Sequence, residues 1–472
     1  MIKFGTGGWR AIIGDEFTKE NLSILCTAVA NMMIEEKKAE KSFVIGYDRR
    51  FLSKESAEWA AEVFAGNGIS CKVIDREAPT PLIMFAVKTM DLDYGMAITA
   101  SHNPALYNGV KLFTAGGRDA NEVVTANLEK YIAAVNVEDI KRVAYAKGLK
   151  QGIITEFNPQ NEYIDSILGL VDTQAIKEAR LKIALDPMFG VSQTSIRTIL
   201  AETRSELEVI HERHDTLFGG RLPAPNEDTL GALSRYVVEN HCDMGVATDG
   251  DADRIGVIDE YGNFINPNQL LVLLYYYLLK YREWRGPVVR NNSTTHLLDR
   301  VAHSFGEECY EVPVGFKHIS SKLEESGAII GGESSGGLTV KGHILGKDGI
   351  YAVALLAEII AITGMKLSEL YREIIGIYGD CYLGDASFHL ADMEEKAVLM
   401  KRIFQDKVMP EFEYEIEKIS YLDGCKVYFK NGGWVIARFS GTEPLLRIAS
   451  EMATEEEANK VVKAFSDVLD LS

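Results

Sequence analysis

The sequence contains little that would place the protein outside the ordinary globular classes. Its 472 residues include only 12 prolines and 6 cysteines, and charged residues make up 25% of the chain. These proportions exclude collagen-like, low-complexity and disulfide-scaffold proteins. The cysteines are scattered and form no C-x-x-C pair, which excludes a zinc ribbon and fits reduced thiols in a cytoplasmic protein.

Positive charge and long apolar runs are also scarce. Lysine and arginine total 50 against 69 aspartates and glutamates, so the formal net charge is −19. Binding to nucleic acid or to an anionic membrane requires a basic face, so we expect neither partner. No apolar run reaches the roughly 18 residues of a transmembrane helix, and the N-terminus has no signal-peptide core. The longest apolar run, residues 269–281, is predicted to be a buried helix.

The sequence does have a repeated alternation of short apolar strands and amphipathic helices. Strands are predicted at 43–47, 69–74 and 94–100, then at 182–186, 206–211 and 244–248, and finally at 287–290, 309–312 and 328–330. Such alternation predicts mostly parallel sheets covered by helices. Polar caps are expected at two early helices, with Thr18 before residues 21–38 and Ser53 at the start of residues 53–65.

Length and pattern together predict four domains, because 472 residues exceed what one hydrophobic core normally fills. We expect three related α/β domains with mixed, mostly parallel sheets at residues 1–150, 151–258 and 259–375. Strands joined by tight turns and a closing helix capped by Thr454 predict a C-terminal α+β domain at residues 376–472. Because ligands bind at the carboxyl ends of parallel strands, the domains are expected around a central cleft.

The strongest chemical signal is DGDADR, residues 249–254, which follows a predicted strand. On a loop, its three aspartates can converge on a hard divalent cation such as Mg²⁺. An EF-hand loop is disfavoured by Arg254, which occupies the position that needs glycine. The aspartyl nucleophile of a haloacid-dehalogenase phosphatase is disfavoured by Asp253 at the fifth position and by the mid-chain location. A magnesium site at a sheet edge fits best, and a solvated acidic turn is the ordinary alternative.

TASHNP, residues 99–104, follows the last strand of the first round, as DGDADR does in the second. A serine there, Ser101, suits phosphoryl transfer beside a divalent metal. A turn shaped by polar residues before Pro104 explains the segment equally well on sequence alone. Lys111, ten positions after Ser101, is a candidate source of a proton or a cation.

Two further segments carry polar groups suited to binding hydroxyl groups and phosphate. GGESSGG, residues 331–337, is not a Walker A loop, and its Glu333 and Ser335 suit hydroxyl recognition. RFSGTEPLLRI, residues 438–448, surrounds a turn with hydroxyls, backbone amides and guanidinium groups, which are the parts of a phosphate cradle. A flexible turn and a hairpin with surface arginines are the respective alternatives.

Together with GTGGWR at residues 5–10, these segments resemble the α-D-phosphohexomutase superfamily, in order and over the whole chain. The resemblance implies four domains around a central cleft and a Mg²⁺-dependent mutase of the phosphoglucomutase-like branch. Such an enzyme interconverts hexose 1-phosphate and hexose 6-phosphate through a phosphoserine and a hexose 1,6-bisphosphate, which also acts as activator. The resemblance further implies small sugar phosphates as ligands, and we expect a monomer or homodimer.

The resemblance implies a role for each matching residue. Ser101 matches the phosphoserine, and it joins Asp249, Asp251 and Asp253 as a magnesium ligand. The residues that match the reacting centre are Arg10, His102, Lys111 and Arg254, with Lys111 the expected general acid/base. The residues that match substrate contacts are Glu333, Ser335, Lys317, Lys347, Arg438, Ser440, Gly441, Thr442 and Arg447.

Two positions depart from the pattern of other branches. Many phosphomannomutase-type and phosphoglucosamine-type members carry histidine where this chain has Gly337, and phosphoglucosamine mutases usually carry glutamine at the position of Ser334. We therefore predict a preference for glucose, with mannose as a second sugar. The alternatives are a phosphomannomutase, a phosphoglucosamine mutase or a glucose-1,6-bisphosphate synthase, then a Mg²⁺-dependent sugar phosphatase, and last a non-catalytic sensor.

Overall fold

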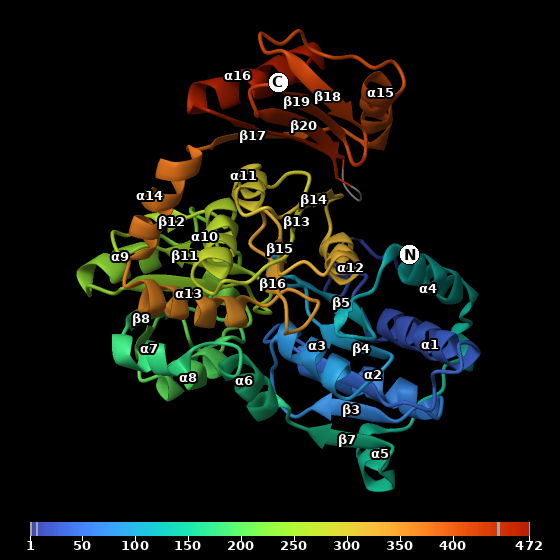
Figure 1. Ribbon diagram of the computed structural model, residues 1–472. Helices are drawn as coiled ribbons and strands as arrows, with labels where there is room; N and C mark the ends of the chain where they lie inside the picture. Colours follow the sequence, from blue (N-terminus) through green and yellow to red (C-terminus); the bar gives the residue numbers. More distant parts are fainter. Residues whose placement is uncertain (1, 6–7, 441–443, 472) are drawn as a thin grey trace.

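The chain folds into four units, each built on one β-sheet, and the fourth unit lies above the other three in Figure 1. The computed structural model describes residues 2–5, 8–440 and 444–471. In the first three units strands alternate with helices, whereas the fourth sheet is antiparallel throughout. The predicted fold class, three α/β domains followed by an α+β domain, is confirmed.

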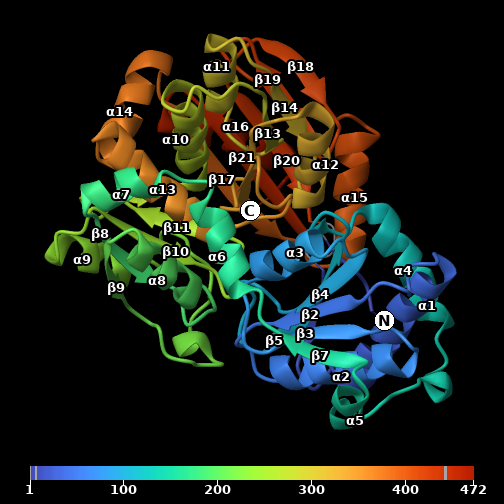
Figure 2. The same cartoon turned by 60° about the horizontal axis from the view of Figure 1, so that its bottom comes forward.

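The first unit is a mixed sheet with helices on both faces (Figure 2). Its strands run in the order β1-β5-β4-β2-β3-β7, with β6 beside β5. They are β1 (Trp9–Ile12), β2 (Phe43–Tyr47), β3 (Cys71–Ile74), β4 (Tyr94–Ile98), β5 (Tyr107–Thr114), β6 (Arg118–Asp119) and β7 (Ile154–Phe157). Its helices are α1 (Lys19–Glu35), α2 (Ser53–Gly66), α3 (Thr80–Thr89), α4 (Glu122–Ala134) and α5 (Tyr145–Gln151), and a 3₁₀ turn spans Val137–Asp139.

The second unit has the strand order β12-β11-β10-β8-β9. Its strands are β8 (Lys182–Asp186), β9 (Glu206–Val209), β10 (Met244–Thr248), β11 (Ile255–Ile258) and β12 (Phe264–Ile265). Its helices are α6 (Gln160–Leu168), α7 (Thr173–Ala179), α8 (Gln193–Glu202) and α9 (Gly231–Glu239), and a 3₁₀ turn spans Phe218–Gly220.

The third unit has the strand order β14-β13-β15-β16. Its strands are β13 (Val288–Asn291), β14 (Cys309–Val312), β15 (Ile330–Gly332) and β16 (Leu338–Val340). Its helices are α10 (Pro267–Lys280), α11 (Leu297–Ser304), α12 (Phe316–Ser326), α13 (Gly349–Thr363) and α14 (Leu367–Tyr378).

The fourth unit has the strand order β17-β21-β20-β19-β18. Its strands are β17 (Tyr382–His389), β18 (Ile416–Ser420), β19 (Cys425–Phe429), β20 (Trp434–Phe439) and β21 (Leu445–Met452), and its helices are α15 (Met393–Phe404) and α16 (Glu455–Val468). Its apolar side chains form a cluster of their own, whereas one large cluster runs through α3 of the first unit and the cores of the second and third. The first three units are therefore joined by a shared apolar core, and the fourth is not.

The carboxyl ends of three central strands carry the polar segments that the sequence singled out. β4 leads to Ser101, β10 to Asp249 and β15 to Glu333. Each strand is paired in parallel with a neighbour, β2 for β4, β8 for β10 and β13 for β15. The three loops therefore leave equivalent edges of three sheets, as ligand sites in such sheets do.

Local predictions from the sequence met mixed outcomes. The Thr18 hydroxyl accepts the Asn21 amide hydrogen and caps α1, as expected. The Ser53 cap was wrong, because Leu52 occupies the cap position of α2 and the Ser53 hydroxyl donates to Asp48 instead. The buried helix expected at residues 269–281 is confirmed as α10.

The sheets extend past the predicted domain boundaries. β7 pairs with β3, so the first sheet continues beyond residue 150, and β12 pairs with β11 beyond residue 258. Among the described residues, no single helix has the length and apolar composition to cross a bilayer. Only α13 and α14 taken together, with a bend of 76° between them, meet that test.

Candidate functional site

Ser101 and Asp249 meet where the first and second units touch. The Ser101 hydroxyl donates a hydrogen bond of 2.7 Å to Asp249 Oδ2, although the residues are 148 positions apart. Ser101 is fully buried and has a φ of +53°, an uncommon value for a non-glycine residue. A Cβ on Gly250 would lie 2.7 Å from the Ser101 carbonyl oxygen, so only glycine lets the two loops approach this closely. The juxtaposition predicted from the repeat is present.

The three aspartates of DGDADR converge on one point. One carboxylate oxygen from each of Asp249, Asp251 and Asp253 lies within 4.8 Å of the others, and all three residues are buried. Lys111 Nζ donates to Asp251 Oδ2 at 2.6 Å and to Asp253 Oδ2 at 2.5 Å. Lys347 Nζ lies 2.9 Å from Asp253 Oδ2. Two lysines thus offset part of the negative charge of three buried carboxylates.

The charges around the aspartates are unevenly balanced. Burial and the neighbouring Asp251 and Asp253 raise the pKa of Asp249 to about 8. Burial would also raise the pKa of Asp253, but Lys111 and Lys347 hold it well below its ordinary value. Burial favours a neutral Lys111, yet Asp251 and Asp253 raise its pKa above the usual range. Without a bound cation at neutral pH, the site therefore holds a protonated Lys111 and an Asp249 that keeps its proton.

The same site fits a hard divalent cation. Asp251 Oδ1 and Asp253 Oδ1 are buried and have no hydrogen-bond partner, which is costly for a carboxylate unless a cation binds there. Carboxylate oxygens in such a group are the ligands that Mg²⁺ prefers. The residues present therefore fit magnesium, with the Ser101 side chain beside them as a further oxygen ligand.

Three other predicted residues contact the serine or its immediate neighbours. His102 Nδ1 lies 3.3 Å from Ser101 Oγ, and burial together with Arg254 and Arg10 lowers the pKa of His102 far below its ordinary value. The imidazole is therefore neutral at neutral pH. Arg10 donates to Asn103 Oδ1 at 2.6 Å, in the serine loop. The Arg254 amide donates to Asp249 Oδ1 at 3.0 Å.

The GGESSGG segment contacts the aspartate loop directly. Gly337 forms a β-bridge with Arg254. A Cβ on Gly337 would lie 2.3 Å from Lys347 Cδ, so the lysine stem occupies the space that a larger residue would need. Glu333 is buried, and its Oε1 accepts hydrogen bonds from Asn291 Nδ2 (3.2 Å) and the Gly315 amide (3.1 Å). The other oxygen of Glu333 takes no part in these contacts.

The remaining predicted substrate residues lie in other contacts. Lys317 pairs with Glu122 Oε1 at 2.8 Å, across from α12 to α4. Arg438 on β20 and Arg447 on β21 are direct cross-strand partners. Like charges placed opposite each other are unfavourable without an anion between or above them. Ser440 is described at the end of β20, whereas Gly441 and Thr442 lie outside the described residues. Within the described residues, no hydrogen bond or ion pair joins the fourth unit to Ser101 or the aspartates.

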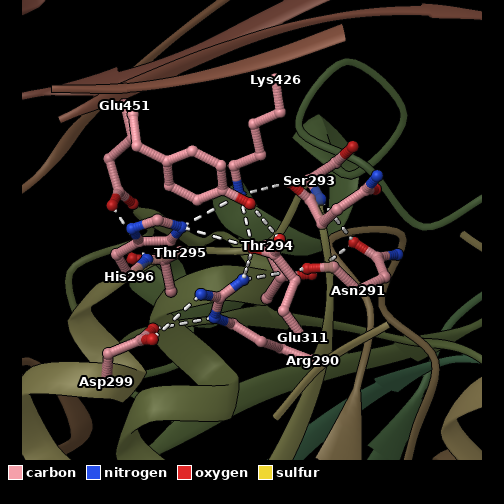
Figure 3. A network of polar contacts seen from close by, with 12 residues as sticks. Arg290, Asn291, Ser293, Thr294, Thr295, His296, Asp299, Glu311, Lys426 and Glu451 are labelled. Carbon is pink, nitrogen blue, oxygen red and sulfur yellow. Dashed lines mark hydrogen bonds and ion pairs between the residues drawn. The ribbon is translucent and has the colours of Figure 1, made fainter. Parts of the chain in front are cut away.

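A polar seam joins the fourth unit to the third (Figure 3). Lys426 of β19 is buried, and its Nζ donates to the Asn292 carbonyl oxygen and to Glu311 Oε2, both at 2.7 Å. Its Nζ also lies 3.0 Å from His296 Nε2. The His296 amide donates to Glu451 Oε1 at 2.9 Å. The loop between β13 and α11 therefore contacts the fourth unit at several points.

Sequence reasoning missed the residue that holds the serine loop. The Arg50 guanidinium donates to the carbonyl oxygens of Ser101, Asn103, Pro104 and Tyr107 at 2.6 to 3.0 Å. Its side chain is fully buried and lies 3.4 Å from Asp48. A signal was available, because Asp48 and Arg50 follow the carboxyl end of the predicted strand at 43–47, where ligand loops occur in parallel sheets.

Comparison with known proteins gives matches over almost the whole chain. The models for the four domains of phosphoglucomutase/phosphomannomutase match residues 1–138 (α/β/α domain I), 161–262 (domain II), 266–378 (domain III) and 393–468 (C-terminal domain).

Two relatives are similar over almost their whole length. A protein of Thermococcus kodakarensis named phosphoglucomutase/phosphomannomutase is 33% identical over 463 residues, which cover 98% of this chain and 96% of that one. A protein of Pyrococcus furiosus named probable phosphoglucosamine mutase is 31% identical, with 98% and 96% coverage. A solved structure, a putative phosphomannomutase from Thermus thermophilus, has a TM-score of 0.85 and 28% identity, covering 99% of each chain.

Proposed function

Because the chain belongs to the phosphoglucomutase/phosphomannomutase family and is therefore a phosphohexomutase, we propose that it interconverts glucose 1-phosphate and glucose 6-phosphate, with mannose phosphates as second substrates. The observation that carries the proposal is the hydrogen bond of 2.7 Å between Ser101 and Asp249, inside a group of three buried aspartates. A nucleophilic hydroxyl beside a divalent-metal site is the arrangement that phosphoryl transfer uses.

In the proposed reaction, Ser101 carries a phosphoryl group and passes it to the free hydroxyl of a bound sugar phosphate. The bond between serine oxygen and phosphorus breaks, a bond from the sugar oxygen to phosphorus forms, and the hydroxyl proton leaves to a base. The sugar bisphosphate then turns over, and its other phosphoryl group returns to Ser101. When bound at the aspartates, Mg²⁺ would stabilise the negative charge of the transferring group.

The neighbouring side chains suit the proton transfers. Lys111, whose Nζ is bonded to Asp251 and Asp253, is proposed as the general acid/base, and His102, 3.3 Å from the serine oxygen, is the second candidate. Glu333, with one oxygen already hydrogen bonded, is proposed to accept hydroxyls of the sugar with the other.

The paired Arg438 and Arg447 are proposed to hold the phosphate that does not react, together with Ser440, Gly441 and Thr442. A guanidinium pair placed side by side suits a dianion. Because both orientations of the bisphosphate must bind, the same phosphate cradle and the same acceptor of sugar hydroxyls, Glu333, serve each half-reaction.

A second candidate is a phosphoglucosamine mutase, which the similarity to the Pyrococcus furiosus protein favours. The preference for glucose rests on Gly337 and Ser334, which differ from the residues usual in that branch. A coupled assay of glucose, mannose and glucosamine 1-phosphates, each with a trace of the matching bisphosphate, separates the candidates. We expect the highest kcat/KM for glucose 1-phosphate, and an equal or higher value for glucosamine 1-phosphate would contradict the preference.

The covalent role of Ser101 has its own test. Ser101→Ala should abolish interconversion while glucose 6-phosphate still binds in calorimetry, because the cradle and the hydroxyl reader are intact. Undiminished turnover by the variant would contradict the phosphoserine. Free phosphate as the main product of the unaltered protein would instead identify a phosphatase.

A further inference from the structure

Polar interactions must fix the position of the fourth unit relative to the third. The apolar core of the fourth unit is separate from the core that the other units share, so apolar packing does not fix the arrangement by itself. Under the proposed function, Arg438 in the fourth unit and Glu333 in the third must grip two ends of one small molecule. An error of about 1 Å in such a span can cost on the order of a hundredfold in rate.

Asp423, in the turn between β18 and β19, contacts both units. Its Oδ2 accepts hydrogen bonds from Arg438 Nε and from the Val314 amide, both at 2.9 Å. Its carbonyl oxygen accepts one from Asn292 Nδ2, also at 2.9 Å. The next residue, Gly424, has a φ of +102°, and a Cβ there would lie 2.6 Å from the Ala437 carbonyl oxygen. The turn is therefore held close against β20, the strand that carries Arg438.

Both contacts on the third unit continue to the same atom. Val314 is followed by Gly315, whose amide donates to Glu333 Oε1 at 3.1 Å. Asn292 is preceded by Asn291, whose Nδ2 donates to that same oxygen at 3.2 Å. Asp423 therefore binds two residues, Val314 and Asn292, whose immediate neighbours in the chain hydrogen bond to the carboxylate of Glu333.

We propose that Asp423 is a positioning residue that couples the phosphate grip of Arg438 to the hydroxyl grip of Glu333. This inference rests on the proposed function, since it assumes that a hexose phosphate spans the two groups. The distance between Arg438 and Glu333 then stays the same in both orientations of the substrate. Asp423 holds it, because it is hydrogen bonded to Arg438 on one side and to the residues next to the hydrogen-bond donors of Glu333 on the other. The residue itself touches neither the reacting atoms nor, through its carboxylate, the sugar.

The charge of Asp423 by itself predicts the opposite effect on ligand binding, so the two explanations can be distinguished. Asp423 places a negative charge beside an arginine that is to hold a phosphate, so its charge alone weakens anion binding. Removing that charge should tighten the binding of any phosphate. If Asp423 instead has a positioning role, its removal should weaken the binding of only those ligands that contact both Arg438 and Glu333.

The experiment compares two ligands in the full-length chain carrying Ser101→Ala, so that no turnover occurs. Dissociation constants for glucose 6-phosphate and for inorganic phosphate are measured by calorimetry with and without Asp423→Asn. We expect the affinity ratio of glucose 6-phosphate to inorganic phosphate to fall about tenfold, within the range of coupled neighbours. Asp470→Asn is the control, because Asp470 pairs with Arg402 on an exposed face of the same unit and should leave the ratio unchanged.

A double-mutant cycle locates the coupling. Glu333→Gln lowers the ratio by itself, and Asp423→Asn added to it should then change the ratio by less than about twofold. An unchanged ratio in Asp423→Asn, or full additivity with Glu333→Gln, would overturn the inference while leaving the proposed function standing. Failure of the Ser101→Ala parent to bind glucose 6-phosphate would overturn both. Thermal melting checks that each variant folds, and Asn292→Ala, which removes the second contact, must shift the ratio in the same direction.

Discussion

The proposed reacting centre and the proposed phosphate cradle are built in contrasting ways. Ser101, the three aspartates and Lys111 are buried between units that share one apolar core. Arg438 and Arg447 lie on a sheet with its own core, which is joined to the third unit through hydrogen bonds and ion pairs. In the proposed enzyme, apolar packing between units therefore positions the group that transfers phosphate, whereas polar contacts between the third and fourth units position the residues that bind the substrate.

The largest expected effect comes from weakening the buried centre at Asp249. Asp249→Asn should lower kcat by about a thousandfold, because one carboxylate next to the serine is lost from the metal site. The same change should stabilise the metal-free protein at pH 8. With a pKa of about 8, folded Asp249 holds its proton better than the unfolded side chain does, so its contribution to stability falls as pH rises from about 4 to 8.

Urea unfolding of the metal-free wild-type and variant proteins at pH 4 and pH 8 measures this second effect. The gain in unfolding free energy should be present at pH 8 and vanish near pH 4. A variant that is less stable than wild type at pH 8 would show that the site does not carry excess negative charge.

The next largest effect tests how the serine loop is held. Arg50→Ala removes the donors for four carbonyl groups and leaves Asp48 without its buried partner, so unfolding free energy should fall by about 3–5 kcal/mol. Activity of the folded fraction should fall by about a hundredfold through misplacement of Ser101. Arg49→Ala is the matched control, because among the described residues the neighbouring arginine donates a single hydrogen bond, to the Glu212 carbonyl oxygen. Equal effects of both variants would contradict the assignment.

A smaller effect is expected when a side chain at position 337 displaces Lys347. In Gly337→Ala the new Cβ would meet Lys347 Cδ at 2.3 Å, so the lysine must move away from Asp253. We expect kcat to fall about tenfold, a change of about 1.4 kcal/mol in the barrier, with little change in melting temperature. Gly376→Ala is the control, because nothing lies within 4 Å of a Cβ at that helical position. A loss of melting temperature without loss of kcat would make Gly337 a purely structural residue.

The smallest effect concerns the seam, and it depends on pH. Burial and the nearby Arg290 lower the pKa of Lys426 to about 7, below the ordinary lysine value. Between pH 7 and about 10 the unfolded lysine is protonated and the folded one is not, so its contribution to stability rises with pH. Lys426→Met should therefore reduce this rise in unfolding free energy. Lys430→Met, which removes an exposed pair with Glu415, should not, and an identical pH profile in both variants would contradict the account.

The meeting of Ser101 and Asp249 could be predicted, because parallel strands bring their carboxyl ends to one edge and both residues follow such ends. Lys426 could not be predicted, because in the strand Cys425–Phe429 it has the appearance of an outward-facing polar residue. Its partner Glu311 comes from a different unit, and a single sequence does not reveal how two units dock. The pairing of Lys347 with Asp253 was also not predicted, because it depends on Gly337, which leaves room for the lysine stem.

The central claim is that Ser101 and the three aspartates form one phosphoryl-transfer site. Its most direct test is the intact mass of the full-length protein after incubation with glucose 1,6-bisphosphate and Mg²⁺, followed by mapping of the modified peptide. The account predicts one added phosphoryl group on Ser101, and none in Ser101→Ala. A protein that stays unmodified, or that carries the group on another residue, would contradict it.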